Sequence, residues 1–154
     1  MSLAIAGDVA LASTSAHFSA AYGLVGLTPD GGMSWLLPRL VGLRRAQEII
    51  LTNCRVSAAD AAAMGLITRV VAPENLMDEG LALAHALANG PLGAIGGARA
   101  LLAQGFGNDL ATQLDLEATR IAEAGTTAGE FRGQGVPSTP SPELPAPGTP
   151  PQLS

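Results

Sequence analysis

The chain changes its sequence pattern twice, and these changes limit the folds it can adopt. Residues 1–74 carry short apolar runs separated by turn residues, which predicts short strands, turns and interspersed helices. Residues 75–128 have helical periodicity, and we expect three helices there, over 75–88, 91–104 and 109–124. Residues 129–154 hold seven of the 11 prolines and predict a disordered Pro/Ser-rich tail. This order argues against a doubly wound nucleotide-binding fold, in which strands and helices alternate throughout.

Local signals place the elements of the first segment. Three strands are expected, over 9–12, 16–21 and 66–71. Two helices are expected, over 31–37 (stopped by Pro38) and 43–51, where Ala46, Ile49 and Ile50 share one face. Ser57 and Asp60 have the spacing of a capping box, and the helix that they open should end at Met64, before a left-handed Gly65.

Composition argues against several classes of function. The net charge is -5 and no basic run occurs, so neither nucleic acid nor an anionic membrane is an expected partner. No apolar run reaches the ~18 residues that a membrane span requires. The apolar N-terminus lacks a positive flank and is interrupted by Asp8, so we reject a signal peptide and expect a cytoplasmic protein.

Metal and nucleophile chemistry have little support in the sequence. His17 and His85 lie far apart on different predicted elements, so a packed or surface histidine is the favoured interpretation of each. The single cysteine, Cys54, has no base nearby in sequence, which favours an inert thiol over a nucleophile. We therefore expect no metal site.

The segment from Phe18 to Gly42 contains one carboxylate, that of Asp30, which precedes Gly31 and Gly32. Two interpretations of Asp30 remain open at this point. It can cap the next helix through its side-chain oxygen. Alternatively, its apolar neighbours can desolvate the carboxylate and suit it to proton transfer near neutral pH. The neighbours meant here are Tyr22, Leu27, Trp35 and Leu36.

Six motifs in order carry a resemblance to a known family. They are LAIAGDV from Leu3, GLTPDGG from Gly26, LPRLVG from Leu37, AQEIILT from Ala46, VSAADA from Val56 and GLITRVV from Gly65. Together they resemble the crotonase superfamily of enoyl-CoA hydratases and isomerases over residues 1 to about 132. The resemblance implies the C-terminal part of a crotonase-type ββα spiral, followed by a helical trimerisation region. It also implies an acyl-CoA thioester substrate, no separate cofactor, enolate stabilisation by two backbone N–H groups, and a homotrimer or hexamer.

The resemblance also assigns roles to individual residues. The two glutamates of family hydratases correspond to Ser2 and Tyr22 here, and neither residue can serve as a carboxylate. The acidic residue of isomerase-type members corresponds to Asp30, in a pattern most similar to the 1,2-epoxyphenylacetyl-CoA isomerase branch. We therefore expect isomerisation by proton transfer rather than hydration. Asp30 is the expected catalytic residue, and the expected substrate-binding residues are Tyr22, Gly31 and Trp35.

At both ends the chain departs from the family pattern. The resemblance places the first oxyanion donor and most of the CoA-binding segment before Met1, so it implies an N-terminally truncated chain that starts inside a helix. The Pro-rich tail replaces the family ending. We expect the missing N-terminal units to leave apolar surface exposed on the strands and on the 75–124 helices. The alternative function is a non-catalytic module that assembles with crotonase-type subunits.

Overall fold

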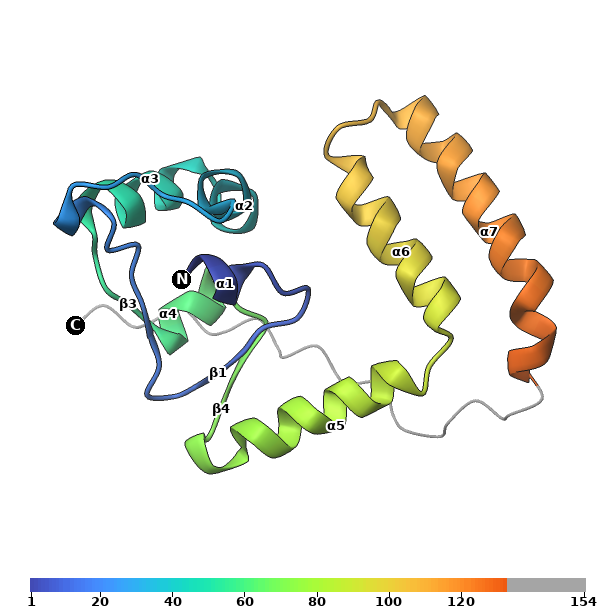
Figure 1. Cartoon of the computed structure of the whole chain (residues 1–154), viewed down its shortest axis with the longest axis horizontal. Helices are drawn as coiled ribbons and strands as arrows, with labels where there is room; N and C mark the ends of the chain where they lie inside the picture. The colour runs from blue at the N-terminus through green and yellow to red at the C-terminus, as the bar shows by residue number, and fades with distance from the viewer. Residues whose placement is uncertain (133–154) are drawn as a thin grey trace, which may run out of the picture. The chain divides into compact units, whose positions relative to one another are not determined.

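The computed structural model describes residues 1–132, with side chains described as far as residue 126. The chain divides into two compact units, one over Met1–Gly80 and one from Leu81 onward, and each is described here by itself. Figure 1 labels helices α1 to α7 and strands β1, β3 and β4. The division falls inside helix α5 (Leu76–Ala88).

Short elements make up the first unit. Its helices are α1 (Ser2–Ile5), η1 (Gly23–Val25), α2 (Met33–Val41), α3 (Leu43–Thr52), α4 (Ala58–Ala63) and η2 (Pro73–Asn75). Its strands are β1 (Leu11–Ser13), β2 (His17–Phe18), β3 (Val56–Ser57) and β4 (Arg69–Val71). Strand β1 pairs in parallel with β4, and β2 pairs antiparallel with β3. Strands β1 and β2 are close in sequence, but each pairs with a strand from a later part of the chain.

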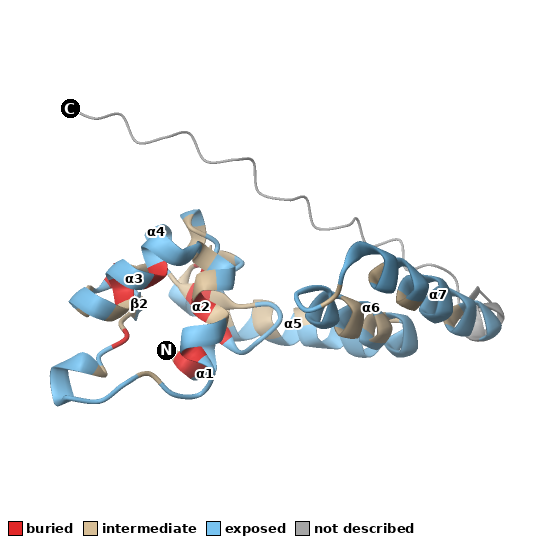
Figure 2. Ribbon diagram, turned by 90° about the horizontal axis from the view of Figure 1, so that it is seen from above, coloured by how far each residue is buried: buried red, intermediate tan, exposed pale blue. Residues whose placement is uncertain are grey.

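The core of the first unit centres on α2 and α3. Met33 and Leu37 of α2 are fully buried, and Ala46 and Ile49 of α3 are nearly so. Figure 2 shows buried residues on α1, α2 and α3 in red. The face predicted for the 43–51 helix is confirmed, because Ile50 also packs against this core. Burial of large apolar side chains supplies the main favourable free energy of this unit.

Several predicted element bounds in this unit are wrong, and of the strand expected over 16–21, β2 covers only His17–Phe18. Helix α2 runs to Val41 and has Pro38 inside it, although a proline there removes a helical hydrogen bond. Leu37, directly before the proline, is buried, and this packing holds the helix against the core despite the lost hydrogen bond. The strand predicted over 66–71 is only three residues long. The amides of Leu66 and Ile67 donate instead to the carbonyl of Ala61 at the end of α4 (2.8 and 3.3 Å).

The capping box at α4 is confirmed with one difference. The amide of Asp60 donates to the Ser57 hydroxyl at 3.1 Å, as predicted. The Asp60 carboxylate accepts the Ser57 hydroxyl proton at 2.6 Å, rather than reaching back to a backbone amide. The helix ends at Ala63, and Gly65 is left-handed with φ +78°, so the predicted termination is also confirmed.

The second unit is helical, as its periodicity predicts. Helix α6 (Leu92–Gly105) and helix α7 (Leu110–Arg132) pack against each other. The Gln113 side-chain amide links the two helices. Its nitrogen donates to the Leu101 carbonyl (3.1 Å), and its oxygen accepts from the Asn108 side chain (2.9 Å). Residues 129–132, assigned to the tail from the sequence, continue α7, because the first proline beyond them is Pro137. The rest of the predicted tail lies outside the described residues.

Apolar side chains cover much of the second unit's surface. No residue of α5 or α6 is buried, and these helices are blue and tan in Figure 2. Leu102, Leu110 and Ile121 are each about three-quarters exposed, at 75%, 73% and 75%. This confirms the expectation of exposed apolar surface on the 75–124 helices. No helix in the described part of the chain is long and apolar enough to cross a membrane.

Helix α7 begins with a charged cap. The Asp109 carboxylate accepts a hydrogen bond from the Thr112 amide at 2.8 Å. This bond to the ionised form lowers the pKa of Asp109 below its ordinary value. A lowered pKa in the folded state means that the cap stabilises the helix above the unfolded pKa of about 3.9 and loses this effect as the pH falls through the folded value.

We predict that Asp109→Asn removes the pH dependence of this cap. The asparagine keeps a capping oxygen but cannot ionise. Wild-type melting temperature, followed by circular dichroism, should exceed that of the variant above about pH 5, and the difference should shrink below about pH 4. Asp115→Asn, which removes one charge further along α7, is the control. A difference that stays constant across this pH range would contradict the prediction.

Candidate functional site

Three polar side chains from separate segments meet in the first unit. The Tyr22 hydroxyl donates to Oδ1 of Asp30 at 2.5 Å. The Ser2 hydroxyl lies 2.8 Å from the Tyr22 hydroxyl and donates to the Asp30 main-chain oxygen at 3.1 Å. These are the three positions that the family resemblance singles out, and the fold brings them into one hydrogen-bonded cluster. We call it the Ser2–Tyr22–Asp30 cluster.

A strained turn positions Tyr22. Ala21 has φ +54°, which is uncommon for a residue with a side chain. The Tyr22 amide donates to the Ala20 carbonyl at 2.7 Å and closes a three-residue turn around Ala21. Ala20, on one side of this turn, is nearly fully buried. Such local strain is maintained only when the surrounding packing enforces it, and it is concentrated at functional positions.

Two glycines allow the Asp30 segment to approach Ser2. Gly31 and Gly32 both have positive φ, at +58° and +81°. A Cβ atom on Gly31 would lie only 3.0 Å from the Cβ of Ser2. Ser2 itself is buried, with 6% of its surface exposed. The turn after Pro29 and Asp30 is therefore approached closely by α1 of this chain.

The structure contradicts both the carboxylate cap and the desolvation that were expected for Asp30. Gly32 caps α2, and no side-chain cap bond is present, so the prediction that Asp30 caps this helix through its carboxylate is wrong. The carboxylate is occupied by Tyr22 instead, while the main-chain oxygen of Asp30 accepts from Met33 at 3.1 Å. The expected desolvation is also wrong, because Asp30 is exposed and Leu27 and Trp35 are 64% and 48% exposed.

Trp35 lies in the first turn of α2. The Arg39 guanidinium stacks over its ring, 3.8 Å from the centroid, and also donates to the Trp35 carbonyl at 2.9 Å. Stacking of this kind is favourable because the ring face is electron-rich. It fixes the indole and presents a flat, half-exposed surface beside a cation. This surface is the structural basis for keeping Trp35 as a predicted substrate-binding residue.

The other titratable candidates have ordinary surroundings. His17 is exposed, and its Nδ1 lies 2.9 Å from the Ser15 carbonyl. His85 is exposed on α5, and Cys54 is a half-buried free thiol. Within residues 1–132, no three His, Cys, Asp or Glu side chains are grouped so that they could hold a metal ion.

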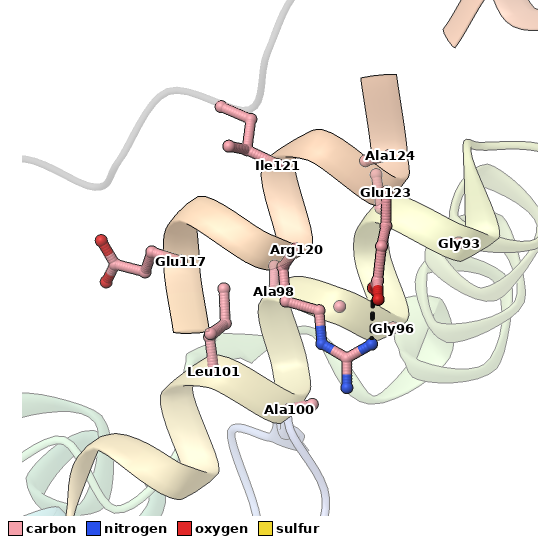
Figure 3. Close-up of a pocket in the computed structure, with 12 residues that line it drawn as sticks. Gly93, Gly96, Ala98, Ala100, Leu101, Glu117, Arg120, Ile121, Glu123 and Ala124 are labelled. Atoms are coloured by element: carbon pink, nitrogen blue, oxygen red, sulfur yellow. Dashed lines mark hydrogen bonds and ion pairs between the residues drawn. The ribbon is translucent and has the colours of Figure 1, made fainter. Parts of the chain in front are cut away.

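A groove of about 590 Å³ lies in the second unit, between α6 and α7. Figure 3 shows it lined by glycines of α6, such as Gly93 and Gly96, and by side chains of α7. Its charged residues include Arg120 and Glu123, which form an ion pair at 2.9 Å. The groove is wide and contains no cluster comparable with Ser2–Tyr22–Asp30, so it is not the candidate site.

Comparison with known proteins settles the family. The sequence profile of the enoyl-CoA hydratase/isomerase family matches residues 1–135. The chain belongs to this family. It is 39% identical over 131 residues to the 1,2-epoxyphenylacetyl-CoA isomerase of Escherichia coli and covers 50% of that protein. It is 32% identical over 131 residues to the short-chain-enoyl-CoA hydratase of Clostridioides difficile and covers 84% of it. Each match takes in 85% of this chain.

Solved structures confirm the predicted fold class. The crystal structure of an enoyl-CoA hydratase from Bacillus anthracis matches 86% of this chain with a TM-score of 0.79 at 30% identity. The match covers 51% of that chain, so this chain spans about half its length, as it does that of the E. coli isomerase. The α/β architecture is thus the C-terminal part of a crotonase-type fold with its helical region. Both hydratases and isomerases occur among the relatives.

The structure gives Ser2 a place that its sequence signal did not reveal. A serine in the first turn of a short helix is not a distinctive sequence signal. Because serine cannot act as a carboxylate, nothing in the sequence pointed to a catalytic role for Ser2. Only its alignment with a family glutamate position linked it to Tyr22 and Asp30. The contact itself depends on the fold, because 28 residues separate Ser2 from Asp30.

We predict that Gly31→Ala destabilises the protein more than Gly26→Ala does. Both substitutions put a side chain at positive φ, which costs about 1–2 kcal/mol. A Cβ at Gly26 meets nothing within 4 Å, whereas at Gly31 it meets Ser2. Crowding at a packed contact adds about 1 kcal/mol or more. Urea unfolding should therefore show the larger loss for Gly31→Ala, and equal losses would contradict the close approach to Ser2.

Proposed function

We propose that this chain carries the proton-transfer step of an acyl-CoA isomerase, with Asp30 as the acid and base. The Asp30 carboxylate takes a proton from one carbon of an acyl-CoA thioester, and the electron pair of that C–H bond moves into the thioester enolate. The same carboxyl group then returns the proton to a different carbon. The double bond moves, and no water or further reagent is consumed.

The composition of the Ser2–Tyr22–Asp30 cluster is the observation that carries this proposal. Hydration uses two carboxylates to direct one water molecule, and this cluster contains one carboxylate and two hydroxyl groups. A serine or tyrosine hydroxyl is a weak acid and needs a base before it can remove a proton itself. One positioned carboxylate is sufficient for proton removal and return.

Substrate contacts follow from the same geometry. We assign the acyl-CoA thioester to the exposed side of Asp30, with Tyr22, Gly31 and Trp35 as substrate-binding residues. The Arg39–Trp35 stack offers a flat surface with a positive charge, which suits part of an anionic coenzyme A. No separate cofactor is needed for proton transfer, and a cytoplasmic location remains part of the proposal.

Asp30→Asn tests the proposed chemistry. Asparagine keeps the size of the side chain and an oxygen that can accept from Tyr22, but it cannot carry the proton. We expect a folded variant without double-bond migration in an enoyl-CoA probe, followed by absorbance. Asp78→Asn on α5 controls for the loss of one charge and should keep wild-type activity. Full activity in Asp30→Asn would remove Asp30 from the mechanism.

The exposed apolar side chains favour a second candidate function, that of a non-catalytic module that assembles with crotonase-type subunits. Contiguous exposed apolar surface is typical of protein interfaces. An inactive wild-type chain would support this candidate over the isomerase. The assembly would be a homotrimer or hexamer, or would include a full-length family member.

We predict self-association at micromolar concentration through the second unit. Leu102→Glu and Ile121→Glu each place a charge on the exposed apolar surface, which should reduce the mass measured by light scattering after size exclusion. Gln104→Glu, at an exposed polar position of α6, is the matched control and should keep the wild-type mass. A wild-type chain that runs as a monomer and does not join a full-length family member would refute the assembly.

A further inference from the structure

The hydrogen bonds around Asp30 occupy one of its two carboxylate oxygens. Oδ1 accepts from the Tyr22 hydroxyl at 2.5 Å, and no described residue donates to Oδ2. The main-chain oxygen of Asp30 accepts from Ser2 at 3.1 Å. The carboxyl group is therefore held on one side by the protein, while its other oxygen remains open.

The number of hydroxyl protons in the cluster determines which group donates to which. Each hydroxyl group has one proton to donate. Tyr22 gives its proton to Asp30, so the proton in the 2.8 Å contact between the two hydroxyl groups comes from Ser2, which shares its single proton between the Tyr22 oxygen and the main-chain oxygen of Asp30 at 3.1 Å. Ser2 thus donates to the Tyr22 oxygen and to the Asp30 backbone, and Tyr22 donates to the Asp30 carboxylate. Hydrogen bonds aligned in this way polarise one another, and a bond to a carboxylate is stronger than one between neutral groups.

We infer that Tyr22 and Ser2 are positioning residues that fix Oδ1 of Asp30 and leave Oδ2 as the atom that exchanges the proton. This inference rests on the proposed isomerase function. When Oδ2 takes the substrate proton, Oδ1 becomes the carbonyl oxygen of the acid and still accepts from Tyr22. The donor chain keeps its direction in both states, so no hydroxyl group has to turn during the reaction and neither hydroxyl proton is transferred.

The surrounding backbone supports a fixed position for the two hydroxyl groups. Ser2 is buried and touches the Asp30–Gly31 turn, which approaches it closely because Gly31 has no side chain. Tyr22 follows the strained turn at Ala21 and accepts, through its carbonyl, from the amides of Val25 and Leu27 (3.1 and 3.0 Å). Both donors are therefore held on rigid local structure before substrate arrives.

Tyr22→Phe is the decisive variant, since it removes the hydroxyl group and keeps the ring. We expect kcat for double-bond migration to fall about ten- to one-hundred-fold with little change in KM, the effect of losing a hydrogen bond to a charged group. Ser2→Ala should lower kcat about two- to tenfold. Ser19→Ala, which removes a hydroxyl of the same segment bonded to the Asn53 carbonyl, should leave both constants unchanged.

Two results would overturn the positioning role. Substrate binding is assigned to the Tyr22 ring, which Tyr22→Phe keeps, so a rise in KM with unchanged kcat would mean that the hydroxyl group contacts the substrate rather than Asp30. A further loss on adding Tyr22→Phe to residual activity in Asp30→Asn would mean that Tyr22 does not act through the Asp30 carboxylate.

A spectroscopic measurement separates this inference from the proposed function. Tyr22 is the single tyrosine of the chain, so the tyrosine doublet of the Raman spectrum reports its hydroxyl group alone. We expect the signature of a strong hydrogen-bond donor in the wild type and its loss in Asp30→Ala. An unchanged doublet in Asp30→Ala would refute the pairing of Tyr22 with Asp30. Absence of isomerase activity in a wild type that shows the donor signature would refute the proposed function, and with it the catalytic use of this pairing.

Discussion

The contact between Gly31 and Ser2 is the constraint on which the candidate site depends. Asp30 belongs to a turn that passes against a buried helix residue, and a Cβ on Gly31 would lie only 3.0 Å from the Cβ of Ser2. Met33, two residues after Gly31, is fully buried, so the same turn also positions the start of α2 against the core. A change that pushes this turn away from Ser2 therefore disturbs both the carboxylate and the packing of α2.

The sequence predicted the elements well where their signals are local. Helix α3, the Ser57 cap and the left-handed Gly65 depend on neighbours within a few residues, and all three were predicted correctly. Residues 66–71 mislead because β-branched apolar residues suit a strand, while their first amides are captured by the end of α4. Pro38 misleads because burial of the adjacent Leu37 overrides a local helix-breaking signal.

The site was predictable only in part, for a related reason. The turn residues after Pro29 identified Asp30 and its two glycines as unusual. Nothing local indicates that Tyr22 would turn toward Asp30 or that Ser2 would meet both, since these contacts connect residues 8 to 28 positions apart. The family resemblance supplied the three positions, but not the hydrogen bonds. The capping interpretation failed because α2 begins at Met33 with Gly32 as its N-cap, two residues beyond Asp30.

Replacement of carboxylates by hydroxyl groups changes what such a site can do. In this cluster, both neighbours of Asp30 are hydroxyl groups, and Asp30 supplies the one carboxylate. In the proposed reaction a single base must be charged to remove a proton and must keep that proton long enough to return it. Water addition needs a second group with a separate proton, and neither Ser2 nor Tyr22 supplies one without a base of its own. In the proposed mechanism, the hydroxyl groups that stand in place of the hydratase carboxylates thus hold the one remaining carboxylate in position for isomerisation.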